Sequence, residues 1–324
     1  MTQTNWFARG LAVLLLAAAA AASAAEPFPV RPVKIVVNTA PGGLTDITTR
    51  LIAQKMGEKL GQSVVIDNRA GGDGLLGIRT VKAAPADGYT LLASAGTIAI
   101  QPAVKQDPGY DLLKDFAPVG PMIRSPLLMV VAADQPDKTL QDFMARARAN
   151  PAKLSYASAG VGTTTHIGAA MFLQQAGLNM LHVPYKGNGA AMPDVMSGRV
   201  GMIFEAYGSG ASKVKEGRLR ALGVTSTRRL PGLPDVPTIA EQGVPNYSYY
   251  LYLALLAPAG TPKDVVQRLS EALRSALASK DLLDRFRDDG SEPMDMSSEQ
   301  FTEFLRRDLQ QMARLVGELG LTKQ

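Results

Sequence analysis

Strand-like and helix-like segments alternate along most of this chain, and that order constrains its fold more than any other feature. The first strand-like runs are KIVVNTA (34–40), SVVIDN (63–68) and YTLLASA (89–95). Helix-like segments follow the first two runs, over 45–60 and 75–84. Strands that alternate with helices usually pair in parallel, so this part of the chain predicts a parallel sheet wrapped by helices.

The middle of the chain repeats this architecture. Its strand-like runs are LLMVVAA (127–133), LSYASAG (154–160), MLHVPYKG (180–187), VGMIFEA (200–206) and LRALGVTS (219–226). Helical stretches are predicted near 139–149, 165–177 and 188–197. With 324 residues, the chain is long enough for about two α/β lobes, each with its own strand, glycine turn and helix.

The last part of the chain differs, because one more strand-like run, YLYLALLAP (250–258), leads into two helices. Thr261 and Pro262 predict the N-cap and the first position of the first helix, with Asp264 as the capping-box acid. Ser297-Ser298 marks the start of the second helix. Both helices carry apolar residues at helical spacing, which predicts a packing role.

The N-terminal segment 1–25 has the pattern of a secretory signal peptide. Arg9 precedes the apolar stretch 11–22, and small residues follow, so cleavage is expected after Ala24 or Ala25. The alternative is a single spanning helix, but the apolar stretch is shorter than the roughly 20 residues that cross a bilayer. We therefore expect a free periplasmic protein.

Composition excludes several classes of function. The chain has no cysteine, which rules out thiol catalysis and thiolate metal sites. Its two histidines, His166 and His182, lack the paired acid of an HExxH motif. The net charge of +5 is spread along the chain without a Lys/Arg tract, so no nucleic acid partner is expected. We expect no metal, no cofactor and no catalytic residue, although a Ser-His-Asp set assembled in space stays open.

The stretch TAPGGLTDITTRLIAQ (39–54) places a glycine turn between a strand and a helix. Pro41 cannot continue the strand ladder, and Gly42 and Gly43 permit backbone angles that are closed to other residues. The helix is expected to begin near Leu44 or Thr45. Helix-start amides then lie at the carboxyl end of a strand, where open α/β sheets bind ligands and where the helix dipole favours an anion. Asp46 either caps this helix or orders water at a ligand.

A second glycine turn, SYASAGVGTTTHIGAAMF (155–172), has the same order of strand, turn, hydroxyl cluster and helix. Small side chains and exposed amides leave space there for a ligand oxygen, at Ser158, Gly160, Gly162, Thr163, Thr164 and Thr165. Because the two turns are expected on facing lobes, together they predict a clamp. His166 is expected to border the cleft, and His182 is expected on a buried strand.

The segment GDGLLG (72–77) has the glycine spacing of a dinucleotide-binding fingerprint. Four residues, 68–71, separate it from its strand, whereas that fingerprint turns directly at the end of the strand. We therefore expect no nucleotide cofactor at this segment.

The chain resembles the substrate-binding proteins of tripartite tricarboxylate transporters, also called the Bordetella uptake gene (Bug) family, over nearly the whole mature sequence. The order and spacing of eight motifs carry the resemblance. They are APGGLTD (40–46), LGQSVVIDNRAGGDGLLG (60–77), APADGYTLL (84–92), YASAGVGTTTH (156–166), VPYKG (183–187), GRLRALGVTSTRR (217–229), PDVPTIAEQGVP (234–245) and APAGTP (257–262).

The resemblance implies a two-lobed α/β periplasmic binding protein of type II, a Venus flytrap in which each lobe is a mostly parallel sheet wrapped by helices. Lobe 1 is expected to comprise 26–125 plus 226–324, and lobe 2 to comprise 126–225, with crossovers near 123–128 and 222–228. Such a monomer closes over a small carboxylate and delivers it to the permease subunits of a membrane transporter. In the family, backbone amides of the two glycine turns meet the carboxylate, partly through ordered waters.

Carried over by position, the resemblance implies a ligand site on four stretches of chain and two single residues. Its residues are Pro41, Gly42, Gly43, Leu44, Thr45, Asp46, Ala95, Gly96, Thr97, Gly162, Thr163, Thr164, Thr165, His166, Tyr185, Lys186, Gly187, Glu205 and Tyr252.

The sequence departs from the family pattern at several of these positions. Glu205 stands where Asp is more common, and Tyr252 and Ala254 stand where the family usually has tryptophan and glycine. Thr164 replaces a common serine and keeps the hydroxyl. Glu205 is either an ordinary solvated carboxylate or, if it faces the cleft, an acceptor for a ligand hydroxyl or amine.

Two alternatives to transport stay open, together with the identity of the ligand. The closed form could dock on a membrane sensor kinase, and a secreted enzyme acting on a carboxylate is a third class. Malate-like diacids, tricarboxylates, acidic amino acids and aromatic acids all fit a pocket of amides and water. Glu205 and Tyr252 favour an acid that also carries a hydroxyl or amine.

Overall fold

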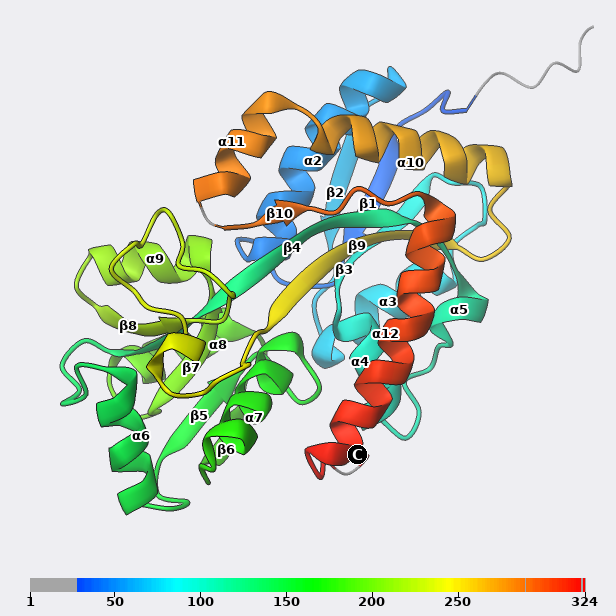
Figure 1. The fold of residues 1–324 in the computed structure, drawn as a ribbon. Coiled ribbons are helices and arrows are strands. Elements are labelled where there is room, and N and C mark those ends of the chain that lie inside the picture. The colour runs from blue at the N-terminus through cyan, green and yellow to red at the C-terminus, as the bar shows by residue number, and fades with distance from the viewer. Residues whose placement is uncertain (1–27, 289, 322, 324) are drawn as a thin grey trace, which may run out of the picture.

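The computed structural model describes residues 28–288, 290–321 and 323, and the predicted signal peptide lies outside them. The described residues form one ten-stranded sheet in the order β2-β1-β3-β9-β4-β7-β5-β6, with β10 and β8 also paired to β4. Two groups of elements share this sheet through the long strand β4 (Phe116–Ala132), and we call them the first and second lobes (Figure 1).

The first lobe contains the strands from both ends of the chain. Its strands are β1 (Val33–Val37), β2 (Val64–Asn68), β3 (Thr90–Ala95), β9 (Tyr250–Pro258), β10 (Glu292–Pro293) and the first part of β4. Its helices are α2 (Leu44–Leu60), η1 (Gly72–Gly74), α3 (Leu75–Lys82), α4 (Thr97–Val104), α5 (Leu112–Asp115), α10 (Lys263–Leu277), α11 (Lys280–Asp288) and α12 (Ser298–Glu318). Strands β2, β1 and β3 are parallel, and β9 lies antiparallel between β3 and β4.

The second lobe is built from the middle of the chain. Its strands are β5 (Ser155–Ser158), β6 (Leu181–Pro184), β7 (Met202–Ala206), β8 (Leu219–Val224) and the second part of β4. Its helices are α6 (Leu140–Ala149), α7 (Thr164–Ala176), α8 (Asn188–Met196) and α9 (Tyr207–Lys215), and the short η2 (Ala240–Gln242) packs beside them. Strands β7, β5 and β6 are parallel, while β4 is antiparallel to β7 and β8. The predicted two-lobed, mostly parallel α/β architecture is confirmed.

Alternate residues of the strands face opposite helical layers, as the two-residue period of a strand requires. Ile35 of β1 packs in a core cluster with Ile52 of α2 and Leu269 of α10. Val36, its neighbour in sequence, belongs to a second cluster with Phe301 of α12. The first lobe is therefore a sheet covered on both faces, which leaves the strand ends and their loops as its functional edge.

The first part of β4 was not predicted from the sequence. Pro118, Gly120 and Pro121 interrupt it, and such residues are normally confined to edge strands or bulges. The strand continues because its register against β9 shifts twice, between Pro118 and Gly120 and between Pro121 and Arg124. Helices α4, α5, α9 and α11 were not predicted either.

The predicted start of α10 was wrong, whereas that of α12 is confirmed. Helix α10 begins at Lys263 with Pro262 as its N-cap, and the Thr261 hydroxyl donates to the Pro258 carbonyl at 2.8 Å instead of capping the helix. Ser297 caps α12 in a capping box with Gln300. The N-cap of α10 therefore lies one residue later than predicted, at Pro262 instead of Thr261.

Thr225 joins the strands that pass between the lobes. Its hydroxyl accepts the N–H of Leu127 in β4 at 2.7 Å and donates to the Tyr249 carbonyl at 2.6 Å. The Tyr249 N–H in turn donates to the Thr225 carbonyl at 2.9 Å. The chain between these residues packs on the second lobe, where Tyr247 contacts the rings of Phe172 and Phe204. The lobe boundaries at 125/126 and 225/226 stay predictions.

Within the described residues, every helix is too short or too polar to cross a membrane.

Candidate functional site

The loop after β5 contacts the first lobe and brings the two lobes together at their strand ends. The Gln101 side-chain N–H of α4 donates to the Val161 carbonyl at 3.3 Å. A Cβ added to Gly162 would lie 2.2 Å from Val104 Cγ2 of α4, and one added to Gly160 would lie 2.4 Å from Asp73 Oδ1 of η1. We call this contact of loop 159–163 with α4 and η1 the seam.

Asp46 organises the first glycine turn. Its Oδ2 accepts the N–H of Gly42 at 2.9 Å, while its Oδ1 accepts from Arg50 Nε and Asn68 Nδ2, each at 3.0 Å. Burial by itself raises the pKa of this carboxyl, but the hydrogen bonds from Arg50, Gly42 and Asn68 outweigh it, and the pKa is lowered. The carboxylate is therefore ionised and serves the turn, while its predicted role in ordering ligand water stays a prediction.

The turn held by Asp46 leads directly into α2, whose N-cap Gly43 gives no side-chain cap. Residues 41–43 are exposed, Leu44 is half-buried and Thr45 is buried. The first N–H groups of a helix have no carbonyl partner within the helix, and they carry its partial positive charge. Helix α2 begins at Leu44, as predicted, and the binding of an anion by its first N–H groups stays a prediction.

Thr163 and Thr165 shape the second glycine turn. Thr163 is the N-cap of α7, and its hydroxyl donates to the Gly160 carbonyl at 2.8 Å. Thr165 Oγ1 accepts the N–H of Ala159 at 3.0 Å. These hydroxyls already serve the loop, and both residues are buried together with Thr164 and His166. The turn is therefore held in shape by its own side chains, and its contact with a ligand stays a prediction.

His166, His182 and Tyr156 form a stack behind this loop. The two imidazole centroids lie 4.0 Å apart at 8°, and the Tyr156 ring stacks on both. His166 Nδ1 accepts the N–H of Gly162 at 3.1 Å, and His182 Nε2 lies 2.7 Å from Ser158 Oγ. Burial lowers the pKa of His166 to about 3, with His182 as a second cause, and burial lowers that of His182 to about 4. Both imidazoles are neutral at neutral pH.

The expectation of a buried strand around His182 was wrong. Strand β6 is an edge strand of the sheet, and its residues are exposed or half-buried. An apolar run alone does not distinguish an edge strand from a central one, because only the pairing in the folded sheet decides its neighbours.

Glu205 lies at the end of β7 with only 5% of its surface exposed. Its carboxylate accepts from Asn188 Nδ2 at 2.9 Å, from the N–H of Ala206 at 3.0 Å, and from the Ser209 hydroxyl. Burial raises the pKa of this carboxyl, against the effect of those hydrogen bonds. Glu205 is thus not an ordinary solvated acid, and its contact with a ligand stays a prediction.

Tyr252 presents its hydroxyl to α12. The O–H donates to Asp308 Oδ2 at 2.6 Å, and the ring packs on Phe304. A Cβ at Gly96 would lie 2.7 Å from the Tyr252 ring, so Gly96 allows the loop after β3 to pass close to it. The Tyr252 hydroxyl, which was expected to shape the pocket, thus donates its proton to Asp308.

The remaining predicted site residues lie on the loops around the seam. Ala95 is half-buried and Thr97 is buried at the start of α4, while Lys186 is exposed. Gly187 adjoins the loop after β5, because its N–H donates to the Ala159 carbonyl at 3.0 Å. The structure therefore brings the loops after β3, β5 and β6 together around the seam.

Sequence reasoning missed the polar residues that border the seam. Asn38 follows β1 directly, and Gln101 is the one polar side chain in the interior of the helix TIAIQPAV. Lys105 Nζ lies 3.1 Å from Asp73 Oδ2 in the turn that resembles a dinucleotide fingerprint. A buried amide in an apolar helix was the signal that would have singled out Gln101.

The glycines of that turn serve packing. A Cβ at Gly74 would lie 2.7 Å from Asn38 Nδ2, and one at Gly77 would lie 2.7 Å from Asn38 Cβ. The glycine spacing therefore lets α3 approach the end of β1.

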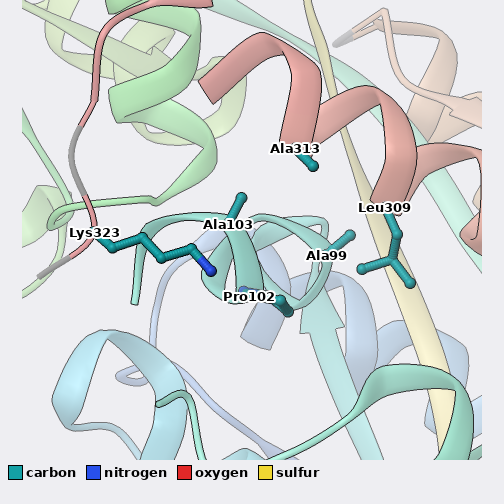
Figure 2. A pocket seen from close by; sticks show the side chains of 6 residues that line it. All are labelled: Ala99, Pro102, Ala103, Leu309, Ala313 and Lys323. Atoms are coloured by element: carbon teal, nitrogen blue, oxygen red, sulfur yellow. The ribbon is translucent and has the colours of Figure 1, made fainter. Parts of the chain in front are cut away.

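A small hollow of about 180 Å³ lies elsewhere on the first lobe, between α4 and α12 (Figure 2). It is lined by Ala99, Pro102, Ala103, Leu309, Ala313 and Lys323. None of the predicted site residues lines it, so it is not part of the candidate site.

A family model described as the tripartite tricarboxylate transporter family receptor, TctC, matches residues 48–321. This chain belongs to the TctC family. It is 36% identical over 313 residues to a curated relative, the UPF0065 protein in the tcbD-tcbE intergenic region of Pseudomonas sp. strain P51, and the match covers 96% of this chain and 93% of that relative.

Solved structures of similar proteins share the TctC fold. The periplasmic binding protein BugD aligns with a TM-score of 0.86 and 31% identity, over 92% of this chain and 100% of BugD. The structure of R. palustris Rpa4515 with adipate aligns with a TM-score of 0.87 and 32% identity, over 92% of this chain and 100% of Rpa4515. MatC (Rpa3494) from Rhodopseudomonas palustris with bound malate aligns with a TM-score of 0.81 and 29% identity, over 89% of this chain and 100% of MatC. The family and the fold are those of periplasmic solute-binding proteins.

Proposed function

We propose that this protein is a periplasmic receptor that binds a small carboxylate between its lobes and delivers it to a tripartite tricarboxylate transporter. The contact of the loop after β5 with α4 and η1 carries the proposal, because it brings the loop that leads into α7 of the second lobe against the first lobe. The adipate in Rpa4515 and the malate in MatC support a carboxylate ligand.

Backbone amides would supply most of the attraction for the ligand. The N-termini of α2 and α7 offer N–H donors, and the side chains of Asp46 and Thr163 hold their turns in place. An anion at such a helix start gains from the partial positive charge without a neighbouring arginine. His166 and His182, which are neutral, add no positive charge to this recognition.

Ligand binding would shift the protein from an open to a closed arrangement of the lobes. A ligand that contacts both lobes only in the closed form stabilises that form by its differential affinity. The bond from Gln101 to Val161 belongs to the closed form, because it joins α4 to the loop after β5.

The hinge would lie where β4 and the ends of β8 and β9 pass between the lobes. Thr225 joins these strands, and Glu292 of β10 pairs with both Arg124 and Arg228 on the two crossing segments. We place the segment 230–247 with the second lobe during closure, because it packs there.

The same geometry supports binding without turnover. The Ser158 hydroxyl lies beside His182, but within the described residues no carboxylate accepts from that imidazole. A hydrolytic set of serine, histidine and acid needs the acid to orient the imidazole. We therefore propose that the bound acid is released unchanged.

A thermal-shift screen of the mature chain, residues 26–324, tests this function. The protein is first unfolded and refolded to remove any bound ligand, then mixed with dicarboxylates, tricarboxylates, acidic amino acids and aromatic acids. A ligand at about a hundred times its dissociation constant should add roughly 2.7 kcal/mol to the free energy of unfolding. A shift with one class of acid names the ligand class, and no shift with any acid would contradict carboxylate binding.

A further inference from the structure

Buried side-chain oxygens with no protein donor lie at the edge of the seam. Among the described residues, the buried side-chain atoms without a hydrogen-bond partner are Asn38 Oδ1, Thr39 Oγ1 and Gln101 Oε1. All three residues belong to segments that follow the carboxyl ends of β1 and β3. A buried acceptor without a donor costs about 1–3 kcal/mol, so three such atoms in one region indicate a partner outside the chain.

The side chain of Gln101 can have only one orientation. Its amide group lies 3.3 Å from the Val161 carbonyl, which can only accept, so Nε2 must face that carbonyl and Oε1 must point away. Gln101 is fully buried. Oε1 is thus an acceptor held in place by a bond that also joins the two lobes.

Ser94 is the hydrogen-bond partner of the Asn38 side-chain amide. The Ser94 hydroxyl donates its single proton to the Ala95 carbonyl at 3.0 Å and accepts from Asn38 Nδ2 at 3.0 Å. Asn38 Oδ1 is therefore left without a donor. Gly74 and Gly77 pack against this side chain and hold it in place, and only 3% of its surface is exposed.

Contacts along the chain connect the two amides through the seam. Asn38 packs on Gly74, and the adjacent Asp73 lies against the backbone of Gly160. The residue after Gly160 is Val161, the acceptor of the Gln101 bond. A continuous set of contacts through η1 and the loop after β5 thus links the two amides, whose oxygens both lack a donor among the described residues.

We propose that the ligand is a carboxylate that also carries an O–H or N–H donor, which Asn38 and Gln101 accept. This inference rests on the proposed carboxylate-binding function and narrows its ligand class to hydroxy acids and amino acids. A plain acid of the same length leaves the two oxygens buried without a donor. Gln101 also couples recognition to closure, because the same amide group binds Val161 of the opposite lobe.

The inference is tested by isothermal titration of the refolded mature chain with matched pairs of acids that differ by one donor group. The pairs are succinate with malate and with aspartate, tricarballylate with citrate, and 3-phenylpropionate with 3-phenyllactate. We expect the donor-bearing member of the bound pair to bind at least about tenfold more tightly, the effect of one hydrogen bond in a buried site.

A variant assigns the preference to Gln101. In Gln101→Met, the affinity ratio within the pair should fall below that of the unmodified protein, because Asn38 alone remains as an acceptor. The plain acid should lose only the affinity that depends on the bond from Gln101 to Val161. Gln54→Met is the matched control, because Gln54 is exposed on α2 away from the seam. The control should retain the full ratio, which separates recognition from general instability.

The outcomes separate the two levels of the proposal. Equal binding of the two members of a pair by the unmodified protein would overturn the donor inference and leave carboxylate binding intact. An unchanged ratio in Gln101→Met would also overturn it. Failure of every acid to bind would overturn the proposed function itself. If the variant does not fold, the affinities of the two acids of a pair for the unmodified protein still decide the inference.

Discussion

Asp46 and the histidine pair are the residues whose structural roles differ most from their roles in the sequence analysis. Asp46 accepts three hydrogen bonds from the turn and its neighbours, and the two imidazoles stack on each other. Each role depends on atoms contributed by distant parts of the chain, such as Asn68 for Asp46. Neighbours in sequence could show only that an acid and a histidine stand at helix starts.

Asp46→Ala should lower the free energy of unfolding by about 1–3 kcal/mol at neutral pH, because the Gly42 N–H and the Asn68 amide lose their acceptor. The lowered pKa of Asp46 means that its contribution is present above the unfolded pKa and is lost as pH falls through the folded pKa. Chemical denaturation at several pH values measures this loss. An equal loss at acid and neutral pH would contradict the role of the ionised carboxylate.

Ligand affinity of Asp46→Ala decides between the two roles named for this residue. Lowered stability with unchanged affinity would support the capping role alone. A large loss of affinity in a variant that remains folded at the assay temperature would support a role in ordering water at the ligand.

His166 and His182 should make the protein less stable in mild acid. Their folded pKa values, about 3 and about 4, lie below the value of 6.5 for an unfolded imidazole, so the unfolded state binds more protons below that pH. Between about pH 7.5 and about pH 5, each neutral imidazole should cost the folded state about 2 kcal/mol. In His166→Gln/His182→Gln, the decline of stability over this range should be smaller. The same decline in the variant would assign the acid sensitivity to other groups.

At the level of elements, the β–α units could be predicted from the sequence, while several short helices could not. Helix α9 contains Gly208 and Gly210, which lower helix propensity, yet it forms because Gly210 allows a close approach to Leu128 of β4. Helix α11 could have been predicted, because Leu282 and Phe286 stand four positions apart, which is the spacing of one helix face. Both side chains are buried in the structure. Propensity was overridden in α9 by a tertiary contact that spacing cannot show.

The turn at the start of α7 should be unable to accept a side chain without loss of ligand binding. A Cβ at Gly162 would lie 2.2 Å from Val104 Cγ2, so Gly162→Ala pushes the loop after β5 away from α4. We expect ligand affinity to fall at least about tenfold. Calorimetric titration with the ligand identified in the screen measures this change.

Gly177→Ala is the matched control for Gly162→Ala. Gly177 ends the same helix with φ 62, close to φ 70 at Gly162, but a Cβ there would have no atom within 4 Å. Both variants carry the strain of a left-handed alanine, and only one meets the opposite lobe. Equal affinity losses in the two variants would show that backbone strain, and not closure, is responsible.

At the level of the whole molecule, closure can be tested by a disulfide across the seam, since the chain has no cysteine of its own. A Cβ on Gly162 would lie 3.3 Å from Val104 Cβ, close to the separation of about 3.5–4.5 Å in disulfides. The oxidised variant Val104→Cys/Gly162→Cys should bind ligand at least about tenfold more slowly, because closed lobes block its entry. Reduction should restore the rate.

Stopped-flow fluorescence with the single variant Val104→Cys as control measures these rates. The reduced double variant carries the same backbone strain as the oxidised one, so their ratio reports closure alone. An unchanged association rate in a fully oxidised sample would show that ligand enters without separation of the lobes.

The sequence by itself determined the alternation of strands and helices, the two glycine turns and the family resemblance, because these depend on local spacing and on the order of short motifs. It also placed Gly162 and Asp46 at helix starts. The tertiary structure alone decided which polar atoms lack a partner: Asn38 and Gln101 matter because distant segments bury one end of each amide and leave the other without a donor. Hydrogen-bond satisfaction depends on neighbours in space, which local sequence patterns do not specify.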